Sequence, residues 1–485
     1  MLPGCPVSAI ALDLGTTSIK AGLLDRNGEL ANLVSCPAPV IAANGGRYES
    51  DALAYASAAE QLLKDCIADA GDCTNLGLCS QRSSFLVWEQ STGQPLTALI
   101  SWQDNRGSAS CVALHAHRNA IHRVSGLPLT QYYFAAKLRV VLQENPGWLP
   151  RLQRGELRAG TLDTFLIWRL TGGRYFITDA SMAARTQLMD IRQQRWSMQL
   201  CKLFDIPVDI LPEIRTSAGI GLRLMKPIAI RPGHQKTMAK SLVIDNGLIL
   251  QSSVGDQSAA LFASVREGQP EALVNLGTGC FVIGYLPDGM SSSDGYLQTL
   301  VYQDGNRHPH FAIEGTLNSV AAAIAPYPAE RCRYEDLAVD DICCIAEPSG
   351  LGAPYFRGDI GIRYSQPVAH LTQQRIAALL LEAVIFRVAR ILEELSREFA
   401  IERVYLSGGL SELDCLRQGI AGCVPFEVHH LRQRESSLHG AGLLAAGRAP
   451  ASHRSSTRIA AAKNAALQKK YSRWKAWLDD LLSAS

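Results

Sequence analysis

The sequence has almost no surplus of charge of either sign. Its 47 Lys and Arg residues nearly balance its 45 Asp and Glu residues, so the formal net charge is +2 at pH 7. This balance gives no reason to expect nucleic acid or an anionic membrane surface as a partner. The sequence also lacks a run of about eighteen apolar residues, so it predicts no membrane-spanning helix.

Cysteine motifs are missing as well. The thirteen cysteines are scattered and odd in number, and none belongs to a C-x-x-C pair. This usage predicts neither a disulfide framework nor a zinc site, and it favours a reducing compartment. The first residues carry no basic segment before their apolar run, so we expect no signal peptide and a cytoplasmic location.

The chain is long, and its length suggests two large domains. At 485 residues it exceeds what one hydrophobic core usually organises. Its 47% hydrophobic and 19% charged residues fit a soluble globular protein. The stretch 214–252 is rich in Gly, Pro and basic residues and shows little periodicity. We therefore predict a first domain over 1–250, a second over 251–450 and a helical tail over 451–485.

The tail is expected to form an amphipathic helix from residue 452 onward. Its apolar face would consist of Tyr471, Trp474, Trp477 and Leu478. Its Lys and Arg residues are expected to lie on the opposite face, in solvent.

Strand, small-residue turn and strand follow one another in both halves of the chain. The pattern covers 8–25, with the turn Gly15-Thr16-Thr17-Ser18, and 272–286, with the turn Gly277-Thr278-Gly279. Successive backbone N–H groups in such turns form a concavity that binds phosphate oxygens. A plain β-hairpin turn is the alternative reading of each. The repetition suggests a duplicated architecture.

Two further features bear on a nucleotide site. Asp13 precedes the first turn, and a carboxylate beside phosphates makes sense with a divalent cation. The pair Gly408-Gly409 follows a late predicted strand. The sequence contains neither G-x-x-x-x-G-K-[ST] nor a G-x-G-x-x-G after a strand, so a P-loop and a dinucleotide site are not indicated.

The stretch "SVGDQSAALFA", residues 253–263, places Asp256 at the start of an apolar run. Asp is a favoured helix N-cap, so Asp256 could serve a helix start alone. It could equally be a carboxylate that takes a proton from a substrate. From these residues alone the two readings stay open.

Seven motifs in a fixed order resemble those of the FGGY family of carbohydrate kinases, and within it those of the glycerol kinases. They are "ALDLGTTSIKAGLLD", "SQRSSFLVWEQSTGQPL…ISWQDNR", "GTLDTFLIWRLTGG…TDASMAARTQLMDI", "VGDQSAALF", "NLGTGCF", "SGLGAPYFRG" and "LSGG". The resemblance covers about 8–450. It implies an α/β fold of two actin-like (ribonuclease H-like) ATPase domains, with ATP and the sugar in an interdomain cleft.

The resemblance also implies ATP and Mg²⁺ as cofactors and assigns residues to them. Asp256 matches the catalytic base, shares the metal with Asp13, and is followed by Gln257, which would hold a neighbouring hydroxyl. The residues implied to contact ATP come from three motifs: Asp13, Gly15, Thr16, Thr17, Ser18, Lys20, Gly277, Thr278, Gly279, Gly408, Gly409 and Leu413. At Leu413 the glycerol kinases have Asn, so adenine would rest on an apolar side chain here.

The implied substrate positions are Arg82, Ser83, Trp102, Tyr132, Gln257 and Phe281, together with Asp256. Glycerol kinases have an Arg-Glu pair where this chain has Arg82-Ser83, and the missing carboxylate normally grips two hydroxyls. We therefore expect a small polyol longer than glycerol, or a ketose, as the acceptor. Glycerol itself, a xylulose- or ribulose-type pentulose, and an ATP-binding sugar sensor remain the alternatives, and a homodimer stays open.

Overall fold

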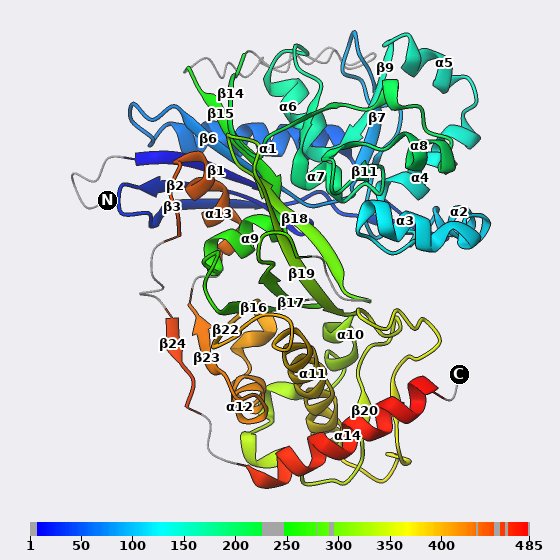
Figure 1. The fold of residues 1–485 in the computed structure, drawn as a ribbon. Coiled ribbons are helices and arrows are strands. Elements are labelled where there is room, and N and C mark those ends of the chain that lie inside the picture. The colour runs from blue at the N-terminus through cyan, green and yellow to red at the C-terminus, as the bar shows by residue number, and fades with distance from the viewer. Residues whose placement is uncertain are drawn as a thin grey trace. The chain divides into compact units, whose positions relative to one another are not determined.

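The computed structural model describes residues 7–225, 247–277, 279–290, 295–432, 435–450, 456–460 and 464–483. The chain forms two compact units (Figure 1). The first consists of Met1–Ala263, Thr299–His310 and Glu435–Pro450, and the second of Ser264–Gln298, Phe311–Arg434 and Ala451–Ser485. Among the described residues, no helix is long and apolar enough to cross a membrane.

A six-stranded sheet organises the first unit, in the order β14-β15-β6-β1-β2-β3. β1 and β6 run parallel, as do β6 and β15, whereas β2, β3 and β14 pair antiparallel with their neighbours. The strands are β1 (Val7–Leu14), β2 (Ser18–Asp25), β3 (Leu30–Pro37), β6 (Asn75–Ser80), β14 (Ala218–Arg223) and β15 (Ile249–Gly255).

The boundary between the two units differs from the domain boundary expected near residue 250. That position lies inside β15, which pairs with β6 from Ile249↔Asn75 to Gly255↔Ser80. β15 is therefore part of the first unit's sheet, and that unit continues to Ala263 and includes Asp256.

Helices cover both faces of this sheet. Alternate strand residues such as Ile10 and Leu12 contribute to a core with α1 (Ala52–Ile67) and α6 (Leu162–Leu170). On the other face Ala9 and Cys79 pack with α9 (Asp256–Ser264) and α13 (Ser436–Ala445). The period of two in the strand sequences produces these two layers.

The α13 helix approaches its neighbours unusually closely because it carries glycines. A Cβ atom on Gly440 would lie 1.9 Å from the carbonyl oxygen of Ala259 in α9, and a Cβ on Gly77 of β6 would lie 2.1 Å from that of Ala441. No side chain fits in either place.

A second, five-stranded sheet of the first unit has the order β4-β5-β8-β7-β9. The helix α4 (Phe134–Glu144) packs on it through Phe134, whose ring meets the edge of Phe85 at 4.9 Å between centroids. The strands are β4 (Ala42–Asn44), β5 (Arg47–Ser50), β7 (Phe85–Glu89), β8 (Leu99–Ile100) and β9 (Leu157–Thr161).

The second unit repeats the start of the first. β16 and β17 form an antiparallel pair and β16 runs parallel to β22, just as β1 pairs with β2 and with β6. The duplicated architecture is therefore confirmed. The sheet order is β18-β19-β17-β16-β22-β23-β24. The strands are β16 (Glu271–Leu276), β17 (Cys280–Tyr285), β18 (Leu297–Gln303), β19 (Pro309–Leu317), β22 (Arg403–Ser407), β23 (Glu427–Leu431) and β24 (Ser456–Arg458).

The tail is helical over a shorter range than expected. β24 pairs antiparallel with β23 and so satisfies the backbone groups of what would be an edge strand. The helix α14 begins only at Ala465 and ends at Ser483.

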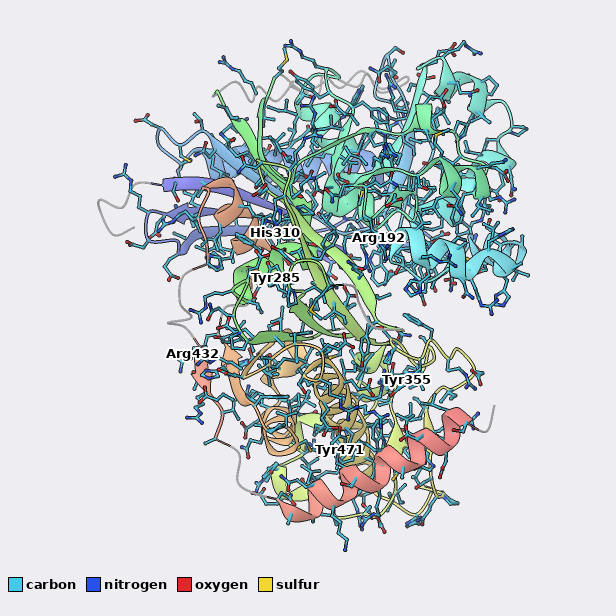
Figure 2. The ribbon with its side chains drawn as sticks, in the orientation of Figure 1. Arg192, Tyr285, His310, Tyr355, Arg432 and Tyr471 are labelled. Atoms are coloured by element: carbon cyan, nitrogen blue, oxygen red, sulfur yellow. The ribbon has the colours of Figure 1, made fainter. Side chains whose placement is uncertain are left out.

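The apolar face of α14 is confirmed, whereas the solvated basic face is partly wrong. Tyr471 stacks on Phe386 of α11 (Gln373–Leu395) at 5.4 Å (Figure 2), and the indole of Trp474 donates to the carbonyl of Cys344 at 2.7 Å. Lys470 is 1% exposed and pairs with the buried Glu382. The ammonium group of Lys470 can be buried there because the Glu382 carboxylate and the backbone carbonyl of Asp340 accept hydrogen bonds from it.

Candidate active site

Three parallel strands of the first unit end at the same edge of its sheet. β1, β6 and β15 are neighbours in that sheet. Segments that follow the carboxyl ends of parallel strands lie next to each other, which is where open α/β sheets bind ligands. Here these ends carry Asp13 in β1, Arg82 two residues after β6, and Asp256 directly after β15.

The turn between β1 and β2 is tight because Gly15 has no side chain. A Cβ atom on Gly15 would lie 2.6 Å from the carbonyl oxygen of Ser18. The carbonyl of Gly15 accepts a hydrogen bond of 2.6 Å from the hydroxyl of Tyr55. The turn is thus held from α1, a contact that the local sequence pattern did not reveal.

The two threonines of this turn differ in their surroundings. The hydroxyl of Thr16 accepts from the indole nitrogen of Trp102 at 3.0 Å and donates to the side-chain oxygen of Gln81 at 3.3 Å. Thr17 is exposed. The sequence assigned the same task to both, but the Thr16 hydroxyl already links the turn to the segments after β6 and β8.

Asp13 is a buried carboxylate whose surroundings disfavour its negative charge. Burial, the negative charge of Asp256 and that of Glu435 raise its pKa to about 7, against the opposing effects of the Cys79 thiol and Lys20. Its Oδ1 atom has no hydrogen-bond partner among the described residues. A cation placed beside Asp13 and Asp256 would relieve this repulsion, so the pair fits a divalent metal ion.

Lys20 is not a lone cation beside the turn. It forms an ion pair with Glu435, which directly precedes α13 and lies 415 residues away in sequence. Sequence reasoning found Lys20 but missed Glu435, and it also missed Cys79, Gln81 and Tyr55. No local motif surrounds these residues, and their roles come from the sheet register and the helix packing.

Asp256 has a helix start and a guanidinium as its neighbours. It begins α9, and its Oδ1 accepts from the backbone nitrogen of Gln257 at 2.7 Å. The same oxygen lies 3.7 Å from Nε of Arg82. Its side chain is 30% exposed, so a ligand can reach it. The helix N-terminus and the guanidinium both favour the ionised carboxylate, which is the form that accepts a proton.

The hydroxyl of Ser83 is engaged in a hydrogen bond, and its backbone adopts a left-handed conformation. Its φ is +64°, in the left-handed region, and the residue is 7% exposed. Its Oγ donates to the carbonyl of Arg185 at 3.1 Å. Its own carbonyl accepts from Nζ of Lys137 at 3.0 Å. The segment that presents Arg82 is therefore fixed from two sides.

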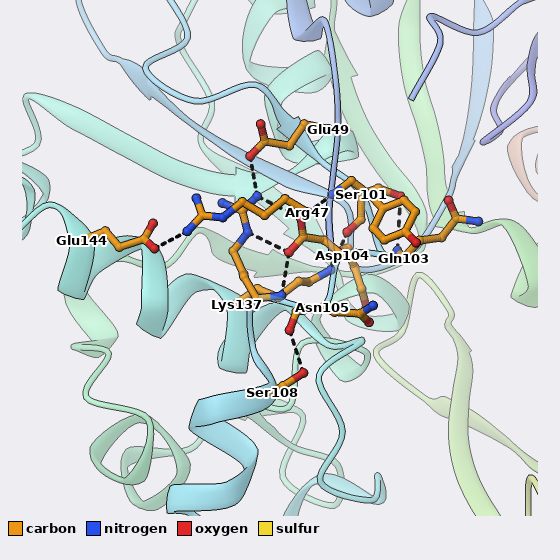
Figure 3. A network of polar contacts seen from close by, with 12 residues as sticks. Arg47, Glu49, Ser101, Gln103, Asp104, Asn105, Ser108, Lys137 and Glu144 are labelled. Carbon is orange, nitrogen blue, oxygen red and sulfur yellow. Dashed lines mark hydrogen bonds and ion pairs between the residues drawn. The ribbon is translucent and has the colours of Figure 1, made fainter. Parts of the chain in front are cut away.

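Lys137 also holds the segment that carries Trp102. Its Nζ donates to the carbonyl of Ser101 at 2.8 Å (Figure 3). Nearby, the buried Asp104 accepts from the backbone of Tyr48 and from Arg106. Burial lowers the pKa of Lys137 to about 7. A neutral amine has two N–H donors, and two carbonyls accept them here.

This burial predicts a dependence of stability on pH. The pKa of Lys137 is about 7 in the fold and 10.5 as the reference value. Between these values the unfolded chain binds more protons, so the free energy of unfolding rises with pH in this window and levels off below it. From pH 7.5 to 9.5 we expect Lys137 to add about 2–3 kcal/mol.

Urea unfolding of the wild type and of Lys137→Met at both pH values measures this contribution. Other titrating groups cancel in the difference between the two proteins, so the variant should lack the added slope. Equal slopes would show that Lys137 keeps its proton in the folded protein.

The two adjacent tyrosines at the expected substrate position differ in their burial. Tyr132 is 39% exposed, whereas Tyr133 is 7% exposed and lies 5.4 Å below the guanidinium of Arg185. Because Ser83 donates to Arg185, Tyr133 shares a neighbour with the Arg82 segment. Tyr133 is thus better placed than Tyr132 to line a pocket near Arg82.

The second unit carries the other two predicted ATP motifs. The amide of Gly277 donates to the carbonyl of Gly279 at 2.9 Å and closes that turn, while Thr278 lies outside the described residues. Gly408 has φ +87° and approaches the carbonyl of Leu276 so closely that a Cβ would lie 2.5 Å from it. Gly409 has open space on its Cβ side. Two glycine turns therefore adjoin at the ends of β16 and β22.

Leu413 and Phe281 belong to the same unit. Leu413 is half-buried, begins α12 (Asp414–Cys423) and packs against the core of its unit. Phe281 lies on β17 opposite Thr316, and its ring edge would meet a Cβ on Gly279 at 3.8 Å. The ring of Phe281 thus adjoins Gly279.

Known proteins share both the sequence pattern and the fold. The chain matches the N-terminal domain of the FGGY family of carbohydrate kinases over residues 8–262 and its C-terminal domain over 272–449. It is 28% identical to glycerol kinase 2 of Streptomyces coelicolor over 459 residues, which cover 90% of this chain and 87% of that protein. It is 30% identical to the glycerol kinase of Rhodopirellula baltica over 463 residues, covering 90% and 82%.

Solved structures agree in fold. The glycerol kinase of Plasmodium falciparum with ADP superposes with a TM-score of 0.81 at 22% identity over 98% of both chains. A xyloylose kinase of Brucella ovis superposes with 0.80 at 20% identity, over 98% of this chain and 99% of that one. These neighbours have the two-domain actin-like fold expected from the sequence. The chain belongs to the FGGY family of carbohydrate kinases, which are ATP-dependent phosphotransferases with an alcohol group as acceptor.

Proposed function

We propose that this enzyme transfers the γ-phosphoryl group of ATP to a hydroxyl of a small polyol or ketose, with Asp256 as the general base. One observation carries the proposal. A reachable carboxylate, Asp256, lies 3.7 Å from a guanidinium and raises the pKa of a second, buried carboxylate, Asp13. A base of this kind works in its ionised form and must meet its substrate. Arg82 and the start of α9 favour the ionised form, and the 30% exposed side chain can be reached.

The reaction follows from these groups. The acceptor hydroxyl donates its hydrogen bond to the Asp256 carboxylate, which takes the proton as the oxygen attacks phosphorus in line. A bond forms between that oxygen and the γ-phosphorus, the bond to the bridging oxygen of ADP breaks, and ADP leaves. The side-chain oxygen of Gln257 is buried without a partner among the described residues, so it suits a neighbouring acceptor hydroxyl.

The phosphates and the metal ion are assigned to the turns. Magnesium would be held by Asp13 and Asp256, where it neutralises charge on the phosphate oxygens. The Gly15–Ser18 turn, with the exposed Thr17, would contact the phosphates. Among the described residues no cluster of three or more His, Cys, Asp or Glu could hold a metal, which suits an ion that takes its other ligands from ATP and water.

In the second unit, we assign the remaining ATP contacts to the glycine turns. Gly277, Thr278 and Gly279 would bind phosphate, and Gly408 and Gly409 would adjoin the adenosine. The open side of Gly409 leaves room for a ligand there. Leu413 supplies an apolar rather than an amide surface.

The acceptor is assigned to a class larger than glycerol. Ser83 offers no carboxylate, and its hydroxyl already donates to Arg185. Without a carboxylate to accept hydrogen bonds from two hydroxyls, the site gains little preference for a substrate that depends on those bonds. Glycerol kinase and xylulose kinase structures superpose about equally well, so the fold leaves this choice to the pocket residues.

A panel of acceptors tests the function. With MgATP present, we expect ADP release to be stimulated by pentitols or ketopentoses with a kcat/KM at least about tenfold above that for glycerol, since one lost polar contact in such a site costs about this much or more. The measurement is a coupled ADP assay, repeated with EDTA, which should abolish release. If the protein binds ATP but no acceptor stimulates ADP release, the protein would be an ATP-binding sugar sensor and not a kinase.

Two variants serve as controls for the pocket argument. Ser83→Glu restores a carboxylate and should move the preference toward glycerol. Ser83→Gln has nearly the same size and the same left-handed backbone but no charge, so it should not. Equal shifts in both variants would mean that volume, and not the carboxylate, sets the acceptor.

A further inference from the structure

Another buried carboxylate of the first unit, Asp179, lies outside every role assigned so far. It ends β10 (Ile177–Asp179) and is 1% exposed. Its oxygens accept from the backbone nitrogens of Ser181 at 2.8 Å and Met182 at 3.0 Å, at the start of α7 (Ala180–Ala184), and from the hydroxyl of Ser217 at 2.6 Å.

Ser181 connects this carboxylate to the strand that carries the proposed base. Its backbone nitrogen donates to Asp179 at 2.8 Å, and its Oγ accepts from the backbone nitrogen of Gly255 at 2.9 Å. Ser181 is therefore fixed to Asp179 through its backbone and to Gly255 through its hydroxyl. Gly255 is the last residue of β15, so this bond holds the amide that immediately precedes Asp256.

Gly255 is also confined on its other side. A Cβ there would lie 2.9 Å from Cδ of Arg82 and 3.6 Å from Sδ of Met182. The aliphatic part of Arg82 therefore lies directly on the Gly255 backbone, and its Nε lies 3.7 Å from Asp256. A shift of Gly255 would move both members of this ion pair.

Ser217 holds the same strand at a second point. Its carbonyl accepts from the backbone nitrogen of Ser253 at 3.0 Å, while its hydroxyl donates to Asp179. Asp179 thus connects to two alternate residues of β15, Ser253 and Gly255, each through one serine.

Capping α7 alone does not account for this arrangement. The helix has only five residues, and a cap needs one acceptor oxygen. Burial raises the pKa of Asp179 to about 7, with the charge of Asp163 adding to it. Burying a carboxylate costs free energy. The hydrogen bonds of the carboxylate offset this cost and hold the neighbouring backbone in place.

We propose that Asp179 and Ser181 are positioning residues that fix the Gly255 amide and thereby aim the Asp256 carboxylate and its Arg82 partner at the acceptor hydroxyl. The proposal rests on the function proposed above for Asp256. Misplacement of a catalytic group by about 1 Å costs on the order of a hundredfold in rate, so loss of the Ser181 hydroxyl should act on kcat far more than on acceptor binding.

Ser181→Ala tests the proposal against a matched variant, Ser125→Ala. Ser125 is likewise buried, and its Oγ likewise accepts from a backbone nitrogen, that of Leu127 at 3.1 Å, in α3 (Arg118–Ser125). We expect kcat to fall by about 10–100-fold in Ser181→Ala with the acceptor KM within about threefold of the wild type, and both values to stay near wild type in Ser125→Ala. Thermal midpoints of the two variants should be similar.

Amide hydrogen exchange over residues 249–258 gives a readout that needs no turnover. Exchange at Gly255 should be faster in Ser181→Ala by about tenfold or more and unchanged in Ser125→Ala. Unchanged exchange, or a wild-type kcat in Ser181→Ala, would overturn the positioning role while leaving Asp256 as the base. If the wild type itself transferred no phosphoryl group, the function would fail, and the exchange result alone would still decide whether Ser181 holds Gly255.

Discussion

Replacing Asp256 by Asn is expected to lower kcat by about a thousandfold, because a positioned general base contributes roughly 10²–10⁴-fold. The amide has nearly the same shape and can still accept a hydrogen bond, but it cannot take the proton of the acceptor hydroxyl. Acceptor binding should therefore survive, with a dissociation constant within about threefold of the wild type. Single-turnover kinetics and calorimetry of acceptor binding separate the two effects.

Asp51→Asn is the matched control for this substitution. Asp51 also stands at a helix start, where its side chain accepts from the backbone nitrogen of Ala54 at 2.9 Å at the head of α1. It shares the position at a helix start but has no part in the proposed site. If Asp256→Asn behaved like Asp51→Asn and kept near-normal turnover, Asp256 would be a structural cap and another group would be the base.

Gly440→Ala is expected to destabilise the first unit by about 3 kcal/mol, near the upper end of the usual cost of overpacking. The new methyl would lie 1.9 Å from the carbonyl of Ala259, a backbone atom of α9 that no rotamer change can move aside. The gain from replacing Gly by Ala in a helix, about 1 kcal/mol, is too small to offset this. We expect the thermal midpoint to fall by about 6 °C or more.

Gly442→Ala, two residues further along the same helix, should behave in the opposite way. Its Cβ would meet side chains of Leu24 and Ala11 at 3.4–3.5 Å, which is ordinary contact. The helix propensity of Ala then decides, so the thermal midpoint should stay the same or rise. Equal destabilisation by both substitutions would show that α13 tolerates no added side chain at either position, and that the Ala259 contact is not the cause.

Asp13 and Asp256 could be proposed from the sequence because each belongs to a local pattern. Asp13 precedes a Gly-Thr turn, and Asp256 begins an apolar run after a strand. Both patterns report a strand end, and strand ends are where such folds place chemistry. The duplicated start of the two units was visible for the same reason, since a strand, a turn and a strand are adjacent in sequence.

What the sequence missed depends on register and on distant packing. Glu435 has no motif of its own, and it reaches Lys20 only because α13 packs on β1 and β6. The unit boundary was misplaced because nothing in β15 itself says which sheet it joins. Tyr132 and Tyr133 could not be separated without knowing which of the two rings faces Arg185.

The assembly of the first unit from three stretches of chain has a consequence for how the protein is made. Its sheet strands are all complete by Gly255, but α13 and Glu435 are required to cover one face and to pair with Lys20. A ribosome adding about 20 residues each second reaches Glu435 some ~20 s after Lys20. During that time the face of β1 and β6 that contains Ala9 and Cys79 lacks its helix. Nascent chains of this enzyme should therefore depend on chaperones until Glu435 and α13 have been made.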